Sequence, residues 1–239
     1  MAFQISLSDN QSCIAREYDN GITLEGDYEV GLKSFVTYSI PNVSQALKNN
    51  LFHLFKYDNL GNTIAGEKLD IPDGTYELQD LFALIKKWAE KFEPDLEFKI
   101  NKNSLKVSMF TKNYTIYVPP SSVCKLFGFT AQIRYPPGKV WESNMIADIF
   151  AINMIKVKCN LVASNYDNLN PCDNTLYEFP LNVEVGERIV ERPSAVSYYR
   201  VKTETIYTLI VRITDQTDNL IDFRGERITL NLEFRPIRR

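Results

Sequence analysis

The only histidine of this 239-residue chain, His53, limits the nucleophilic chemistry open to it. A Ser/His/Asp or Cys/His arrangement would need this imidazole as its base. The run Leu51–Tyr57 around it is largely apolar, however, and we assign this run to a strand. We therefore expect a packed or edge-exposed histidine rather than a catalytic one.

Metal coordination finds equally little support in the sequence. The four cysteines lack the short Cys-x-x-Cys spacing of structural zinc sites, and they are Cys13, Cys124, Cys159 and Cys172. A zinc or iron site without such cysteines would need several histidines. We expect reduced cysteines that pack within the fold, and neither a metal ion nor a cofactor.

Two groups of acidic residues could supply paired carboxylates for general acid and base chemistry. The groups are Glu25, Asp27 and Glu29, and Asp215, Asp218 and Asp222. Each group falls at an expected turn or on the wet face of an expected strand, where Asp and Asn commonly stabilise the turn. Turn residues are the favoured interpretation, and a hydrolase that uses paired acids stays an alternative.

Tyrosines in expected loops offer a platform for stacking on bases or sugars, at Tyr198, at Tyr199 and in the loop Tyr135–Gly138. The chain carries 27 Lys and Arg against 30 Asp and Glu, a net charge of -3, so no broad basic surface accompanies them. We expect packing or protein contacts and no specific nucleic-acid binding. The short basic tail Arg235–Arg239 is interpreted as a solvated terminus.

The clearest part of the scaffold that holds these residues is Ile206–Phe234, which predicts two long strands joined by a polar connection. One face of each strand is apolar, with Tyr207, Leu209, Val211 and Ile213 on the first and Ile228, Leu230, Leu232 and Phe234 on the second. We expect the two strands to form a terminal hairpin. Because Ile206 and Ile210 make the opposite face apolar, we expect an inserted helix or a neighbouring subunit to cover them.

The middle of the chain predicts an α+β arrangement. Leu78 to about Phe92 has an apolar stripe at helical spacing, formed by Leu78, Leu81, Phe82, Ile85, Trp88, Ala89 and Phe92. Three short strands near residues 96–100, 105–109 and 114–118 are expected to follow as a meander. A short helix at Val123–Phe127 is expected to end at Gly128.

Alternating strands return after this segment, for example at Ile155–Ala163. Long strands at both ends and a helix between them predict a mainly β fold, a β-sandwich interrupted by an insertion. We place the sandwich at residues 1–60 and 141–239, and the inserted α+β segment at 61–140. No signal peptide and no apolar run near the ~18 residues of a membrane helix are present, so we expect synthesis in the cytosol, without secretion or membrane insertion.

Six segments follow one another in a distinctive order over nearly the whole chain. They read DYEVGLKSFVTYSIPN, IPDGTYELQDL, LEFKINKNSLKV, SVCKLFGF, KVWESN and NLIDFRGERITLNLEF. Together they resemble the penton, or minor capsid, proteins of Polinton/Maverick elements and adintovirus-like double-stranded DNA viruses. The likeness is strongest at Asp222–Glu226 and in the turn Pro72–Leu78.

The resemblance implies a single jelly-roll protein that forms a homopentamer at the five-fold vertices of an icosahedral virion. Its neighbours in the shell would be trimers of a double jelly-roll major capsid protein, and a vertex fibre or receptor is a further conceivable partner. The resemblance implies no enzymatic activity, and it carries over no catalytic, cofactor-binding, metal or interface residue. We interpret Asp222–Glu226 as residues that fix a turn.

A different class of function stays open beside this one. A β-sandwich binding module would recognise a glycan or a host protein through two loops, Tyr135–Trp141 and Asn165–Asn174. In that alternative Trp141 is the central contact.

Overall fold

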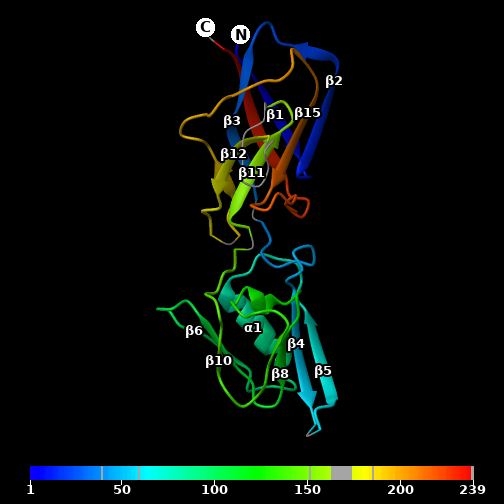
Figure 1. The fold of residues 1–239 in the computed structure, drawn as a ribbon, viewed down its shortest axis with the longest axis vertical. Coiled ribbons are helices and arrows are strands. Elements are labelled where there is room, and N and C mark those ends of the chain that lie inside the picture. The colour runs from blue at the N-terminus through cyan, green and yellow to red at the C-terminus, as the bar shows by residue number, and fades with distance from the viewer. Residues whose placement is uncertain (39, 59, 151, 163–173, 185, 238–239) are drawn as a thin grey trace. The chain divides into compact units, whose positions relative to one another are not determined.

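The computed structural model describes residues 1–38, 40–58, 60–150, 152–162, 174–184 and 186–237. The chain divides into two compact units (Figure 1). The first unit is formed by Met1–Ile40 with Ile152–Arg239, and the second unit by Pro41–Ala151. The insertion therefore begins earlier and ends later than the expected boundaries at residues 61 and 140. The reason is that Leu51–Tyr57 pairs with strands of the second unit and not with the sandwich.

The first unit contains two antiparallel sheets. The β1 sheet has the order β1 (Phe3–Asp9), β16 (Ile228–Pro236), β3 (Tyr28–Thr37) and β13 (Ile189–Glu191), and β14 (Tyr199–Arg200) also pairs with β3. The β2 sheet has the order β12 (Thr175–Pro180), β11 (Met154–Cys159), β15 (Thr205–Thr214) and β2 (Cys13–Thr23).

The pairing of these strands is nested. Strand β1 pairs with β16, β2 with β15, β3 with β13 and β14, and β11 with β12. The first strand of the unit thus pairs with the last strand. The second strand pairs with the last but one, and so on toward the middle of the chain. Contacts of β3 with β16 and of β11 with β15 complete the two sheets. This order is that of a jelly-roll sandwich, so the predicted fold class is confirmed.

The core of the first unit lies between its two sheets. Both sheets bury alternate residues, namely Ile228, Leu230, Leu232 and Phe234 on β16 and Leu209, Val211 and Ile213 on β15. Phe35 of β3 and Phe179 of β12 meet across the core, with ring centroids 5.5 Å apart. Each large side chain buried in this way contributes roughly 1.5–3 kcal/mol to stability.

The last two long strands do not form the predicted terminal hairpin. Strand β15 lies between β11 and β2, whereas β16 lies between β1 and β3. Alternation along a strand identifies the buried face, but it does not identify the neighbouring strand. The two apolar faces meet across the core instead of lying side by side in one sheet.

A bulge between β2 and β15 changes which residues of β15 face the core. The pairing passes from Ile206 opposite Ile22 to Thr208 opposite Glu17, so that β2 carries the extra residues. Tyr207 of β15 has no partner in this register, so the alternation of β15 is also interrupted at this point. As a result Ile206 is fully buried in the core of its own unit and Tyr207 is 61% exposed, and the predicted faces are wrong at this end of β15.

The second unit contains two further sheets. One has the order β5 (Thr63–Asp70), β4 (Leu51–Tyr57), β8 (Thr115–Val118) and β9 (Ile133–Tyr135). The other has the order β10 (Trp141–Glu142), β7 (Val107–Phe110) and β6 (Glu97–Ile100). The predicted strand at Leu51–Tyr57 is confirmed.

The helix α1 (Leu78–Ala89) forms where the apolar stripe predicts it, although it ends before Phe92. It buries Leu81, Phe82, Ile85 and Ala89, which pack with residues of both sheets in the core of the second unit. No helix within the described ranges is long and apolar enough to cross a membrane.

The predicted short helix after Ser122 is a 3-10 turn, η1 (Val123–Lys125). The Ser122 hydroxyl accepts a hydrogen bond from the Cys124 N–H at 3.2 Å. Gly128 follows with a φ of 85°, and a Cβ there would overlap the Met145 carbonyl. Glycine is therefore required at this position.

The three strands after α1 do not form the predicted meander. Strand β6 pairs with β7, but β8 pairs with β4 and β9 in the other sheet. The fully buried Glu93 explains this change of direction. Its carboxylate accepts hydrogen bonds from the backbone N–H groups of Lys112, Asn113 and Tyr114, at 2.9, 2.9 and 3.0 Å. These bonds hold the turn that leads the chain from β7 into the other sheet.

Candidate functional site

His53 lies on β4, on the opposite face from the buried Phe52 and Leu54. Its ring centroid is 6.0 Å from that of Phe55 and 6.3 Å from that of Tyr117. Burial lowers the pKa of His53, and both ring nitrogens lack a hydrogen-bond partner within the described residues. Because no carboxylate orients the ring, His53 is not arranged as the base of a triad.

The acidic residues before and within β3 lie in ion pairs on the surface of the β1 sheet. Asp27 binds Arg200 at 2.8 Å, and Glu29 binds Arg235 at 2.5 Å. Glu25 is exposed. These contacts give Asp27 and Glu29 a structural role on the surface, and they do not bring two carboxylates together over one cleft.

Two acids of the second group hold turns, as predicted. The Asp215 carboxylate accepts hydrogen bonds from the backbone N–H groups of Thr217 and Asn219, at 2.8 and 2.9 Å. The Asp222 carboxylate accepts one from the Arg224 N–H at 2.8 Å. The bond between Asp222 and Arg224 fixes the start of the turn in Asp222–Glu226. It supports the interpretation of this segment as a structural element.

Asp218 has an additional role. It lies 2.7 Å from the ammonium group of Lys158 and 3.5 Å from that of Lys156, both on β11. Burial alone would raise the pKa of Asp218, but the hydrogen bonds and charges of the two lysines lower it below its ordinary value. The three residues attach the connection after β15 to the β2 sheet.

The cysteines agree with the prediction of reduced, packed thiols in two of the four positions. Cys124 and Cys159 are free and buried, and burial raises their pKa to about 12 and about 11. Cys13 is free but exposed, and Cys172 lies outside the described residues. In the part of the chain that the structure describes, no cluster of three or more His, Cys, Asp or Glu could hold a metal ion.

Tyr198 packs against the outer face of the β1 sheet. Its hydroxyl donates a hydrogen bond to Glu233 at 2.6 Å, and the Arg235 guanidinium lies 3.4 Å from its ring centroid. This bond lowers the pKa of Glu233, which keeps the carboxylate ionised. The segment can approach because a Cβ at Gly31 would overlap Val196. Tyr198 is therefore a packing residue, as predicted.

The Trp141 ring, central to the alternative of a binding module, is already occupied. Its indole N–H donates to the Pro136 carbonyl at 2.8 Å, and the Lys139 ammonium lies 3.5 Å from its ring centroid. The Tyr135 ring packs on it at 5.4 Å. Apart from Asn174, the other loop of that alternative lies outside the described residues.

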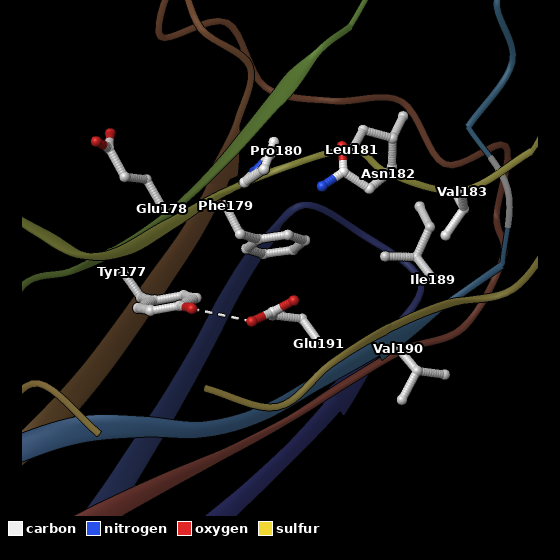
Figure 2. A pocket seen from close by; sticks show the side chains of 10 residues that line it. All are labelled: Tyr177, Glu178, Phe179, Pro180, Leu181, Asn182, Val183, Ile189, Val190 and Glu191. Atoms are coloured by element: carbon white, nitrogen blue, oxygen red, sulfur yellow. Dashed lines mark hydrogen bonds between the residues drawn. The ribbon is translucent and has the colours of Figure 1, made fainter. Parts of the chain in front are cut away.

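A hollow of about 220 Å³ opens in the first unit, where β12 and β13 end their sheets (Figure 2). Phe179 and Ile189 form its apolar floor, and both are nearly fully buried. Strand β13 has only three residues, so it covers little of the space beside β12. The hollow is thus a place where the edge of the sandwich stays open.

The polar groups that line this hollow carry negative charge. The Tyr177 hydroxyl donates a hydrogen bond to a Glu191 oxygen at 2.9 Å (Figure 2). Burial, together with this bond and the charge of Glu191, raises the pKa of Tyr177. The Glu178 side chain points away from the hollow, on the other side of β12 (Figure 2). Glu191 forms no ion pair with another described residue. An apolar floor beside the Glu191 carboxylate suits a group with an apolar stem and a cationic head.

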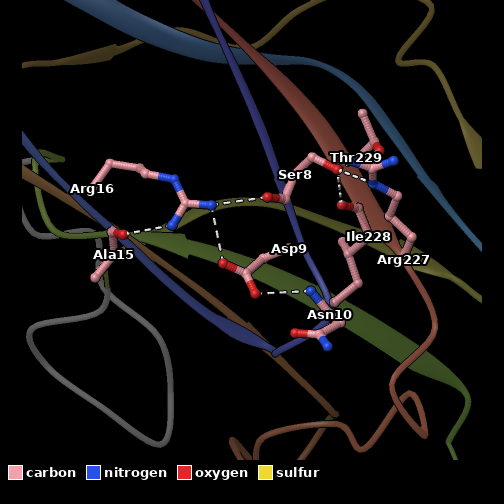
Figure 3. A network of polar contacts seen from close by, with 8 residues as sticks. All are labelled: Ser8, Asp9, Asn10, Ala15, Arg16, Arg227, Ile228 and Thr229. Atoms are coloured by element: carbon pink, nitrogen blue, oxygen red, sulfur yellow. Dashed lines mark hydrogen bonds and ion pairs between the residues drawn. The ribbon is translucent and has the colours of Figure 1, made fainter.

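The opposite edge of the first unit, formed by β1 and β2, is closed by its own side chains (Figure 3). Arg16 donates to the Ser8 carbonyl at 2.9 Å and pairs with Asp9 at 3.0 Å. The hydrogen bond from Arg16 lowers the pKa of Asp9. Arg227 donates to the Ser8 hydroxyl at 2.8 Å, and it has no acidic partner within the described ranges.

The sequence predictions missed both of these edges. The available signal was the charge of Thr175–Glu191, which holds four acidic residues and one basic residue. A charge imbalance along a strand does not reveal its position at the edge of a sheet, because this position depends on the partners of the strand.

No protein-family model matches this sequence, and no curated protein matches it. Among solved structures, the chain is similar to the crystal structure of the selenomethionine-labelled mavirus penton protein. The two share 13% sequence identity over 99% of this chain and 100% of that chain, with a TM-score of 0.49. A likeness at this level carries no argument about function, and the fold assignment rests on the strand order described above.

Proposed function

We propose that this chain is a structural capsid protein, a penton that forms homopentamers at the five-fold vertices of an icosahedral virion. The observation that carries the proposal is the nested pairing of β1 with β16, β2 with β15, β3 with β13 and β14, and β11 with β12. Viral capsid subunits are a principal use of this jelly-roll order. Since a fold does not determine a function, further support must come from the residues.

The interior of the first unit supports a structural role. Positions between its sheets are filled by apolar side chains such as Ile14, Val157 and Leu209, all fully buried. A jelly roll that binds a small molecule inside needs a cavity with convergent polar groups. The hollow of this unit lies at its edge instead, where a neighbouring molecule has access.

The segments that carry the penton resemblance hold the architecture together. Asn42 and Tyr76 belong to two different segments, and they bind each other twice. The Asn42 amide donates to the Tyr76 carbonyl at 2.7 Å, and the Tyr76 N–H donates to the Asn42 side-chain oxygen at 2.9 Å. Within one further segment, the Asp222 carboxylate accepts a hydrogen bond from the Arg224 N–H and fixes the turn before β16. Because these turns lie in the segments that resemble penton proteins, they support the proposed role.

The proposal includes partners and a location. The pentamer would contact a double jelly-roll major capsid protein within the virion, and a vertex fibre or a receptor would be a further partner. The proposed role requires no enzymatic activity, metal ion or cofactor. The arrangement of His53 and of the acidic residues, described above, supports this part of the proposal.

Native mass spectrometry and cryo-electron microscopy of the purified chain test the proposal. We expect closed pentamers, and we expect the chain at the vertices of shells when it is co-expressed with a double jelly-roll major capsid protein. A chain that stays monomeric throughout a concentration series, and that is missing from assembled shells, would refute a penton role.

We do not propose the binding module as a second function. The Trp141 ring is covered by Lys139 and Tyr135, which leaves it poorly placed to stack on a sugar. Glycan binding that is lost in Trp141→Ala, with the fold retained, would revive this alternative.

A further inference from the structure

The free charges at the two edges of the first unit lie at the same height in the β1 sheet. Backbone pairing joins one row of residues across the sheet, Ser8, Thr229, Val36 and Val190, and the next row is Leu7, Leu230, Phe35 and Glu191. Ser8 holds the side chain of Arg227, and Glu191 lines the hollow. The Arg227 guanidinium and the Glu191 carboxylate therefore lie at opposite ends of neighbouring rows. Neither forms an ion pair with another described residue.

This arrangement has the geometry that a closed ring needs. In a ring, one edge of each copy meets the opposite edge of the next copy, and the same contact is repeated. Rotation about the ring axis leaves the height along that axis unchanged. Two surface patches that meet in a ring must therefore lie at the same height along the ring axis. If the strands run parallel to this axis, the Arg227 side chain and the hollow meet this condition.

We propose that the hollow between β12 and β13 receives the Arg227 side chain of a second copy of this chain. The apolar stem of the arginine lies against Phe179 and Ile189. Its guanidinium binds Glu191. The inference rests on the proposed function, because it names the contact that closes the pentamer.

The shape and charge of the hollow favour an arginine side chain as its occupant. A guanidinium has five donors in a planar fork that matches carboxylates, and the stem of the side chain covers apolar surface. The hollow of about 220 Å³ exceeds several-fold the roughly 30 Å³ that one water occupies in the liquid. Arginine is also among the residues that dominate the binding energy of protein interfaces.

Charge complementarity selects Arg227 among the arginines near the two edges. Arg16 is neutralised by Asp9 at 3.0 Å. Arg188, close to the hollow in sequence, lies 5.6 Å from the Tyr38 ring centroid. Arg227 is exposed, and its guanidinium contacts only a hydroxyl within the described residues.

A charge exchange tests the contact, with native mass spectrometry of the full chain as the readout. We expect Arg227→Glu and Glu191→Arg each to raise the dissociation constant between copies at least about tenfold, because each places like charges together. The double variant carrying both changes should recover most of the pentamer. Circular dichroism and thermal unfolding verify that each variant is folded.

Matched controls come from the same segments. Arg224→Glu and Glu187→Arg change the same charges at exposed positions outside the hollow, and both should remain pentameric. Pentamers that persist in Arg227→Glu and in Glu191→Arg would overturn the inference and leave the penton role intact. Single variants that dissociate without recovery in the double variant would also overturn it. A native chain that never forms pentamers would remove the inference together with the proposed function.

Discussion

The two edges of the jelly roll, β1–β2 and β12–β13, differ in how their outer strands are covered. A sandwich must end at strands whose outer backbone groups lack partners, and folded proteins protect such edges. At the β1–β2 edge, Arg16 connects the two sheets through Ser8 and Asp9. At the β12–β13 edge, the short strand β13 leaves a hollow beside the Glu191 carboxylate, which has no ion-pair partner among the described residues. The first edge is therefore closed by contacts within the chain, whereas the second edge is the one that the proposed pentamer would cover.

Side-chain truncation at the two edges should produce the largest effects on stability. Leu7→Ala should lower the free energy of unfolding by about 4 kcal/mol, because the closed edge cannot collapse into the space. Phe179→Ala should lower the free energy of unfolding by about 3 kcal/mol. It removes more atoms than Leu7→Ala, but water can enter the space because the hollow is already open. Denaturant unfolding of the monomeric protein measures both. If Phe179→Ala proved much the costlier of the two, the β12–β13 edge would be closed as well.

Removal of the arginine that closes the β1–β2 edge should have a smaller effect. Arg16→Ala loses the hydrogen bond to the Ser8 carbonyl and the ion pair with Asp9, whose side chains are partly exposed. We expect a loss of about 1 kcal/mol in the free energy of unfolding. Arg227→Ala is the matched control, since its one contact is with the Ser8 hydroxyl. A larger loss in Arg227→Ala than in Arg16→Ala would contradict the description of this edge.

The same edge should respond to acid. Because Arg16 lowers the pKa of Asp9 from its ordinary 3.8, the contribution of this pair is complete above that pH. It is lost as the pH falls through the lowered pKa of the folded state. Unfolding curves recorded over this range should show a weaker acid dependence in Arg16→Ala than in the native chain. An unchanged dependence would mean that Arg16 does not determine the ionisation of Asp9.

The smallest effect is expected in the hollow. Tyr177→Phe removes the hydrogen bond to Glu191, and it should lower the free energy of unfolding by about 0.5 kcal/mol because Glu191 can then bind water. Thermal unfolding of the monomer provides the measurement. A loss as large as that of Phe179→Ala would show that the phenol is a main support of this edge.

Local patterns in the sequence were sufficient for the elements that repeat regularly. Alternation identified the buried face of β16, and helical spacing identified the buried residues of α1. The sandwich and its insertion followed from the order of these elements. Each of these features depends on residues close together in the chain.

The remaining features depend on contacts between distant residues, which a single sequence does not display. The faces of Ile206 and Tyr207 are reversed because Tyr207 has no partner in the irregular pairing of β15 with β2, so the alternation of β15 is interrupted there. The meander failed because Glu93 binds the backbone of a turn. The hollow was missed because β12 and β13 are edges only once both sheets are assembled.

The pairing of β1 with β16 determines the order in which parts of the chain can fold during synthesis. Phe3 pairs with Phe234 and Asp9 with Ile228, so the two strands lie more than 200 residues apart in the chain. A ribosome needs roughly 10 to 45 s to travel between them at 5–20 residues per second. During this interval the second unit has time to fold, whereas β1 waits with its backbone unpaired. The jelly roll therefore closes last, after its final strand has emerged.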